Sequence, residues 1–151
     1  MEKIDLNGHF YSPTKGNLLI RQVIEEITGY IKERPEKFYD IIVGCDSSSE
    51  EEPNFPIVIA ILRKGEGGRF FLKKIKYSSD FNKRFIYWKN RILQEVLLSC
   101  DLALLLRASF DGDGTVVNVK RGGCRINLVC ENKPLAEQVS ELLLRFGILS
   151  S

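Results

Sequence analysis

Two acidic residues, Asp46 and Glu95, occupy positions at which a metal-dependent hydrolase could use them. Asp46 directly follows residues 39–44, a short and largely apolar run that is typical of a buried strand. Glu95 lies in a long, mostly apolar helical segment, where an isolated charge would be costly. Carboxylates bind hard cations such as Mg²⁺, and two such ions about 4 Å apart can flank a scissile phosphate. The alternative is that Asp46 caps a turn and Glu95 faces solvent.

A second pair of acids, Asp111 and Asp113, alternates with glycines at the predicted C-terminal end of the same helix. Negative side chains there oppose the helix macrodipole unless a cation compensates them, which favours metal binding. An ordinary Asp-Gly turn is the alternative. An EF-hand is excluded because the other ligands of its loop are absent.

The hydrophobic pattern indicates the elements that would position these acids. Helical spacing predicts a first helix that ends before Pro35 and a long helix over residues 84–111. Apolar, β-branched runs predict three antiparallel strands, and the C-terminal region predicts a β-hairpin and a last helix. The strands are expected at 39–44, 55–62 and 69–77, the hairpin at 115–130 and the last helix at 134–146. The expected fold class is therefore α/β (α+β).

Charge is unevenly distributed along the chain. Residues 1–62 carry 6 basic and 11 acidic side chains, whereas residues 63–91 carry 10 basic and 2 acidic ones, interleaved with aromatic residues. Basic side chains that contact phosphates, next to aromatic rings that stack on bases, are typical of protein surfaces that bind nucleic acids. The alternative is a solvated strand face with the aromatics in the core. The candidate nucleic-acid contacts in this block are Lys73, Lys74, Lys76, Lys83 and Arg84.

Composition excludes several other kinds of chemistry. The 151 residues with a net charge of +2 predict one domain, without a membrane span or a signal peptide, and we expect a cytoplasmic protein. The four cysteines lack CxxC spacing, and the single histidine, His9, is expected at the surface. A zinc site and a Ser-His-Asp triad are therefore disfavoured, and hydrolysis would depend on carboxylates with Mg²⁺ or Mn²⁺.

Four segments together resemble the YkuK-type ribonuclease H-like family of bacteria. They are residues 10–16, 39–47, 63–71 and 91–95 with Ser99, and the resemblance spans about residues 9–106. It implies a sheet of three antiparallel strands, with Asp46 as the acid of the first strand and Glu95 as the acid of the helix. Cys45 stands where the family usually has Thr. The family's next strand, which carries another Asp, is not recognisable, so we expect a truncated domain with an incomplete carboxylate set.

The C-terminal third resembles the LAGLIDADG homing endonucleases. Residues 106–114, followed by 126–128 and 142–148, carry this resemblance over about residues 102–151. It implies that Asp113 is a metal-binding catalytic acid and that Asp111 is the preceding acid of the motif. It also implies major-groove contacts from the hairpin through Lys120, Arg121, Arg125 and Asn127. Only half of a unit is present, so cleavage by this part would require a homodimer.

Together the two resemblances predict a chimera. Residues 1–100 would form the ribonuclease H-like part and residues 101–151 the LAGLIDADG half unit, with the long helix at about 84–111 shared. The hairpin is expected to pair with the edge of the three-stranded sheet. The expected function is a Mg²⁺- or Mn²⁺-dependent nuclease acting on DNA or RNA. In one form it would use Asp46 and Glu95, with Asp111 or Asp113 in place of the missing acid. In the other it would be a DNA endonuclease that works as a dimer through Asp113. The alternative is a catalytically inactive remnant that binds nucleic acid.

Overall fold

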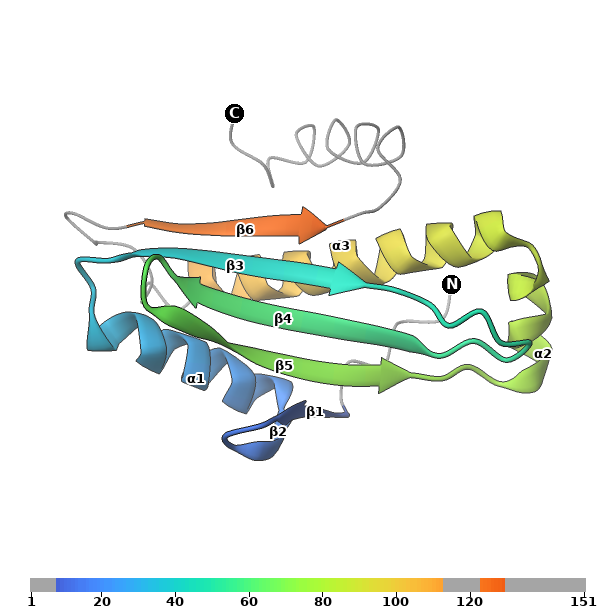
Figure 1. Ribbon diagram of the computed structural model, residues 1–151, viewed down its shortest axis with the longest axis horizontal. Helices are drawn as coiled ribbons and strands as arrows, with labels where there is room; N and C mark the ends of the chain where they lie inside the picture. The colour runs from blue at the N-terminus through green and yellow to red at the C-terminus, as the bar shows by residue number, and fades with distance from the viewer. Residues whose placement is uncertain (1–7, 113–122, 130–151) are drawn as a thin grey trace.

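Figure 1 presents the computed structural model, in which residues 8–112 and 123–129 are described. The helices are α1 (Ile20–Glu33), α2 (Ser79–Asn82) and α3 (Trp88–Gly112), and a 3-10 turn, η1 (Lys83–Ile86), joins α2 to α3. The strands are β1 (His9–Ser12), β2 (Gly16–Leu19), β3 (Phe38–Cys45), β4 (Phe55–Arg63), β5 (Gly67–Ile75) and β6 (Gly123–Val129). The expected mixture of helices and strands is confirmed.

Within the described residues the strands form one six-stranded sheet in the order β2-β1-β5-β4-β3-β6. Neighbouring strands are antiparallel except β3 and β6, which are parallel. The three antiparallel strands expected from the sequence are β3, β4 and β5, joined in register through pairs such as Ile41 with Ile61 and Ile59 with Phe71. The sheet is wider than the predicted three strands, because the β1–β2 hairpin and β6 extend its two sides.

One face of the sheet carries the core. Alternate residues of β4 are fully buried (Ile57, Ile59 and Ile61), as period-two strands with one covered face require. The same core contains one stripe of α1 and one of α3, so both helices cover this face; their buried residues are Val23, Ile27, Tyr30 and Ile31 in α1 and Leu98, Leu102, Leu106 and Phe110 in α3. On the opposite face, Leu62 and Phe70 stay exposed.

The long helix begins later than its sequence pattern indicated. Residues 79–86 form α2 and η1, and Tyr87 then adopts an extended backbone (φ −88°, ψ 121°) before α3 starts at Trp88. This break lets Phe85 turn into the core, where it is 4% exposed. In Figure 1, α3 then runs behind the strands, from the end of β3 back toward its beginning. None of the helices among the described residues has the length and apolar character of a membrane span.

β6 corrects the prediction for the C-terminal third. It lies beside β3 in parallel register, from Phe38 opposite Gly123 to Gly44 opposite Val129. The expectation that this region pairs with the sheet edge is thus confirmed for residues 123–129. The described residues contain no LAGLIDADG hairpin. A strand that was not recognised from the sequence does follow the long helix, but residues 123–129 carry no acid. The other expected hairpin arm (115–120) and the last helix (134–146) lie outside the described residues. The expected domain boundary near residue 100 falls inside α3.

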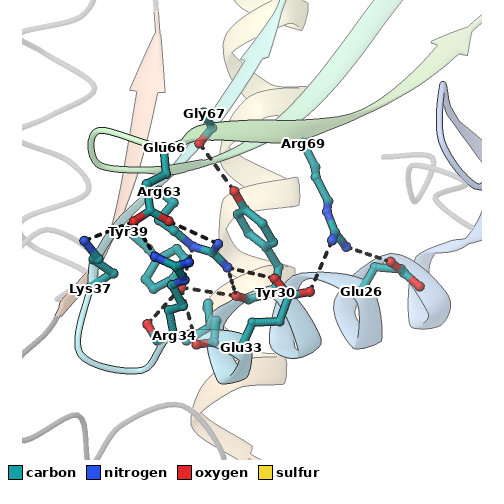
Figure 2. A network of polar contacts seen from close by, with 11 residues as sticks. Glu26, Tyr30, Glu33, Arg34, Lys37, Tyr39, Arg63, Glu66, Gly67 and Arg69 are labelled. Carbon is teal, nitrogen blue, oxygen red and sulfur yellow. Dashed lines mark hydrogen bonds and ion pairs between the residues drawn. The ribbon is translucent and has the colours of Figure 1, made fainter.

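A polar network closes the end of the sheet at which β3 begins (Figure 2). The side chain of Arg63, 8% exposed, donates to the Tyr39 hydroxyl (2.9 Å), to the Tyr30 carbonyl (2.8 Å) and to Glu33 (2.9 Å). The Tyr39 hydroxyl also lies 3.0 Å from the carbonyl of Arg34. These groups satisfy carbonyls at the C-terminal end of α1, which lack partners within the helix. The network therefore fixes α1 against β3 and β4.

Candidate carboxylate site

Asp46 lies at the opposite end of β3 from this network. Its backbone N–H donates to the Pro56 carbonyl (3.3 Å), so the pairing of β3 with β4 continues one residue beyond the strand. Its side chain is exposed, and Oδ1 accepts a hydrogen bond from the backbone N–H of Ser47 (2.9 Å). The carboxylate of Asp46 is therefore accessible, while its backbone is held in place by the pairing of β3 with β4.

Glu95 lies two turns into α3 and is half-buried. Its Oε1 accepts a hydrogen bond of 2.5 Å from the hydroxyl of Ser47, the residue next to Asp46. One turn further on, the buried hydroxyl of Ser99 donates to the backbone carbonyl of Glu95 (2.8 Å). The interpretation that Glu95 merely faces solvent therefore does not hold, because its carboxylate is bound to the segment that follows β3.

The thiol of Cys45 provides a separate indication that the two acids converge. Burial, together with the negative charges of Glu95 and Asp46, raises the pKa of this thiol to about 12. Both carboxylates therefore lie close enough to Cys45 to act on its charge. The thiol stays protonated near neutral pH, so Cys45 is unsuited to serve as a nucleophile or a thiolate ligand.

The loop after Asp46 is held from two sides. Ser48 and Asn54 close it, since the Ser48 N–H donates to the Asn54 carbonyl and the Asn54 N–H donates to the Ser48 hydroxyl, both at 3.0 Å. From α3, the guanidinium of Arg91 lies 3.4 Å from the Ser48 carbonyl. The acid-bearing segment is thus attached both to its own loop and to the helix that carries Glu95.

The described backbone does not bring Asp111 to this site. Asp111 lies in the last turn of α3, 16 residues after Glu95 (111 − 95), which corresponds to about 24 Å along a helix. Figure 1 places this end of α3 toward the beginning of β3, away from the end of β3. Asp113 lies outside the described residues. Asp46 and Glu95 are therefore the pair that the described structure assembles.

These residues fit a hard cation rather than a soft one. The available donors are carboxylate and hydroxyl oxygens, and Mg²⁺ is commonly held by one or two carboxylates together with substrate phosphates. Across residues 8–112 and 123–129 no cluster of three or more His, Cys, Asp or Glu side chains could hold a metal ion. Asp46, Glu95 and Ser47 thus offer oxygen donors of the kind that a hard cation takes.

The basic block divides between the core and the surface: some of its aromatic residues lie in the core, while most of its cations are exposed. Phe71 and Phe85 are buried, and Tyr77 and Phe81 pack on Phe85, with ring centroids 5.6 Å from it. The cations remain accessible on β5 and beyond it: Lys73 is half-buried, and Lys74, Lys76, Lys83 and Arg84 are exposed. Lys120 and Arg121 lie outside the described residues, and Arg125 is described only as backbone of β6.

Two features of this region escaped the sequence analysis. Ser47 was not recognised as the bridge between the two acids, although it follows Asp46 directly. The exposure of Ile86, Tyr87 and Trp88 was also not specified, because the aromatic residues of the basic block were compatible with either a nucleic-acid surface or the core. His9, in contrast, is exposed as expected.

Comparison with known proteins identifies the fold family. The chain matches the model of the ribonuclease H-like family over residues 22–127, from α1 into β6. No curated protein and no solved structure matches it. The match continues through residues 102–127, which the sequence resemblance had assigned to a LAGLIDADG unit, and nothing in the comparisons supports such a fusion. At a coarse level, the mixed sheet and its helices are consistent with this single family. The chain belongs to the ribonuclease H-like family.

Proposed function

We propose that the protein is a nuclease of the YkuK type that hydrolyses phosphodiester bonds in DNA or RNA and depends on Mg²⁺ or Mn²⁺. Membership of the ribonuclease H-like family supports a nuclease-like or nucleic-acid-related role. The observation that carries the proposal is the 2.5 Å hydrogen bond between Ser47 and Glu95. It joins the segment bearing Asp46 to the helix bearing the second acid, so that both carboxylates serve one site.

Each residue has a distinct task in this proposal. Asp46 is exposed and can bind a cation directly, whereas the half-buried Glu95 is oriented by the Ser47 hydroxyl. Ser47 is a positioning residue, since it acts through Glu95. A cation held here would supply Lewis acidity and would lower the pKa of bound water. Cys45 stays protonated beside the acids and adds no further negative charge.

Glu131, which lies outside the described residues, is a candidate third acid because it follows the end of β6 by two positions in the sequence. Gly44 lies opposite Val129 in the parallel pairing, and Asp46 follows Gly44 by two residues just as Glu131 follows Val129. The YkuK-type resemblance implies an acid on the strand after the long helix. We therefore expect Glu131→Gln to lower cleavage as strongly as Asp46→Asn. Cleavage equal to the parent would restrict the centre to the pair.

The test is cleavage of single-stranded, duplex and hybrid nucleic acids with Mg²⁺ or Mn²⁺. Asp46→Asn and Glu95→Gln should each lower the rate by about 100-fold or more, because each removes a ligand charge. Asp101→Asn is the matched control, since Asp101 is an exposed acid on the same helix, six residues beyond Glu95. Loss of cleavage in Asp113→Asn with retention in Asp46→Asn would contradict the proposal.

The second candidate function is binding of nucleic acid without cleavage. The exposed cations of residues 73–84 favour it, since contacts to phosphate require no catalytic group. Salt-dependent binding, with no cleavage by the parent under any metal condition, would select this alternative. The homodimer expected from the LAGLIDADG resemblance has no support in the structure or in the comparisons, and neither candidate function requires it.

A further inference from the structure

Three consecutive apolar side chains are exposed where η1 meets α3. Ile86 is 73% exposed, Tyr87 70% and Trp88 56%. Single exposed apolar residues are ordinary on protein surfaces, but contiguous large ones mark interaction sites. Together with their basic neighbours they form what we call the α3 corner, which consists of Lys83, Arg84, Ile86, Tyr87, Trp88, Lys89 and Arg91.

The backbone of the α3 corner is held by packing and by hydrogen bonds, so the exposure of its apolar side chains does not result from a frayed helix end. Phe85, between Arg84 and Ile86, is buried against Phe55, with ring centroids 4.8 Å apart. The side-chain amide of Asn90 donates to the Arg84 carbonyl (2.6 Å), and the Asn90 N–H donates to the Tyr87 carbonyl (3.0 Å). The backbone of the corner is thereby tied across the break between η1 and α3.

The charge of the corner suits a polyanion. Residues 81–94 contain four basic side chains and no acidic one. The Lys89 ammonium lies 5.8 Å from the centre of the Trp88 ring, which places a cation beside the exposed aromatic face. Lys83 pairs with Asp80 at the surface, where such pairs are weak and easily exchanged. Aromatic faces that stack on bases, flanked by cations that meet phosphates, are the usual means of binding single strands.

The corner is continuous with the carboxylate site along one face of α3. Trp88, Arg91 and Glu95 follow one another at i, i+3 and i+7, so they share a face of the helix. Trp88 and Glu95 are seven residues apart, or about 10.5 Å along the axis, which equals about three stacked-base steps. A strand with a base on Trp88 can therefore bring a phosphate a few nucleotides away to Asp46 and Glu95.

We propose that the α3 corner binds an unpaired nucleic-acid strand by stacking its bases on Trp88 and Tyr87, and that it delivers this strand to the carboxylate site. The delivery step rests on the proposed nuclease function, whereas the stacking step does not. A duplex is the poorer ligand, because its bases are stacked on one another and offer no free face to the indole. The substrate class is therefore single-stranded DNA or RNA, or an unpaired segment of either.

Binding can be followed directly because Trp88 is the only tryptophan in the chain. Its fluorescence is titrated with a short oligothymidylate, a short oligouridylate and a blunt duplex, using the Asp46→Asn full-length chain to prevent cleavage. We expect quenching by the single strands and little by the duplex. In anisotropy with a labelled strand, Trp88→Ala should weaken binding by about tenfold or more, as expected for loss of one stacked base, while Trp88→Phe should retain most of it.

Two matched controls test location and charge. Phe70→Ala removes an exposed aromatic side chain from β5 and should leave affinity unchanged. Lys89→Glu should weaken binding strongly, whereas Lys64→Glu, an equal charge reversal near the β4–β5 turn, should have a smaller effect. Thermal melts establish that each variant is folded.

The outcomes separate this inference from the proposed function. Equal quenching by the duplex, or unchanged affinity in a folded Trp88→Ala variant, overturns the inference and leaves nuclease activity standing. A shift of Trp88 emission with anionic lipid vesicles, or on self-association in sedimentation, without a response to single strands, also overturns it. Quenching by single strands without cleavage by the parent supports the stacking step and overturns the nuclease proposal.

Discussion

The hydroxyl of Ser47 donates a hydrogen bond of 2.5 Å to Oε1 of Glu95 and so joins the end of β3 to the second turn of α3. The two residues are 48 positions apart in the sequence. Because Asp46 directly precedes Ser47, this contact links the side chain of Glu95 to the segment that carries the other acid. The first prediction follows from this arrangement.

Ser47→Ala should lower metal-dependent cleavage and weaken Mg²⁺ binding, because Glu95 loses the donor that orients it. The effect on stability should be small, about 1 kcal/mol, as for one hydrogen bond. Initial rates over a series of Mg²⁺ concentrations measure the first effect, and urea unfolding measures the second. Ser109→Ala is the control, since Ser109 donates to a helix carbonyl at the far end of α3. Equal loss of activity in both variants would refute the role of Ser47.

Cys45 should resist alkylation near neutral pH in the folded protein, because its pKa is raised to about 12 by burial and by the charges of Glu95 and Asp46. A thiol with a raised pKa in the folded state holds its proton more tightly than in the unfolded chain. Its stabilising contribution is therefore complete below the ordinary value of 9.0 and is lost as the pH rises toward about 12. Cys45→Thr should flatten this alkaline decline in urea unfolding. Peptide mapping of labelled thiols checks the reactivity, and labelling of native Cys45 as fast as in urea would contradict the prediction.

Arg63→Ala should destabilise the fold by about 3 kcal/mol, because it leaves Tyr39 and the carbonyls at the end of α1 without their buried donor. Arg69→Ala is the comparison, since Arg69 is more exposed and its ion pairs with Glu26 and Glu33 should contribute about 1 kcal/mol or less. Urea unfolding gives both values. A cost no larger for Arg63→Ala than for Arg69→Ala would show that the network in Figure 2 is not a structural anchor.

The same network should make the protein sensitive to acid. The hydrogen bond from Arg63 lowers the pKa of Glu33, and that from Lys37 lowers the pKa of Glu66. A carboxyl whose pKa is lowered in the folded state stabilises the fold above its ordinary value of 4.5, and this stability is lost as the pH falls through the lowered value. The double variant Glu33→Gln/Glu66→Gln should therefore lose less stability between neutral pH and pH values below 4.5 than the parent does.

Two glycines should respond in opposite ways to alanine. A Cβ on Gly68 would press against the carbonyl oxygen of Ile61, so Gly68→Ala should disturb the pairing of β4 with β5 and lower the melting temperature. Nothing lies within 4 Å of a Cβ on Gly29, which is in α1, so Gly29→Ala should stabilise the fold by about 0.5–1 kcal/mol. Destabilisation by both substitutions would contradict this difference.

The sequence was informative where the signals are local. The apolar run before Asp46 and the helical pattern around Glu95 placed both acids correctly at a strand end and on a helix. The partner of β6 could not be predicted in this way, because a short strand that pairs in parallel across a long helix has the same alternation as a hairpin arm. Phe85 and Trp88 were also ambiguous. Three residues apart, they would share a face of a continuous helix, but the extended backbone of Tyr87 sends Phe85 inward and leaves Trp88 exposed.

The parallel pairing of β6 with β3 has a consequence for synthesis of the chain. β3 acquires its antiparallel neighbour β4 after a loop of nine residues (46–54), but its other side stays open until residues 123–129 have left the ribosome. During that interval the strand that leads to Asp46 presents unpaired backbone N–H and C=O groups, which can template pairing with another chain. Nascent chains halted before residue 123 should therefore aggregate, so that pairing with β6 protects the folding intermediate as well as extending the sheet.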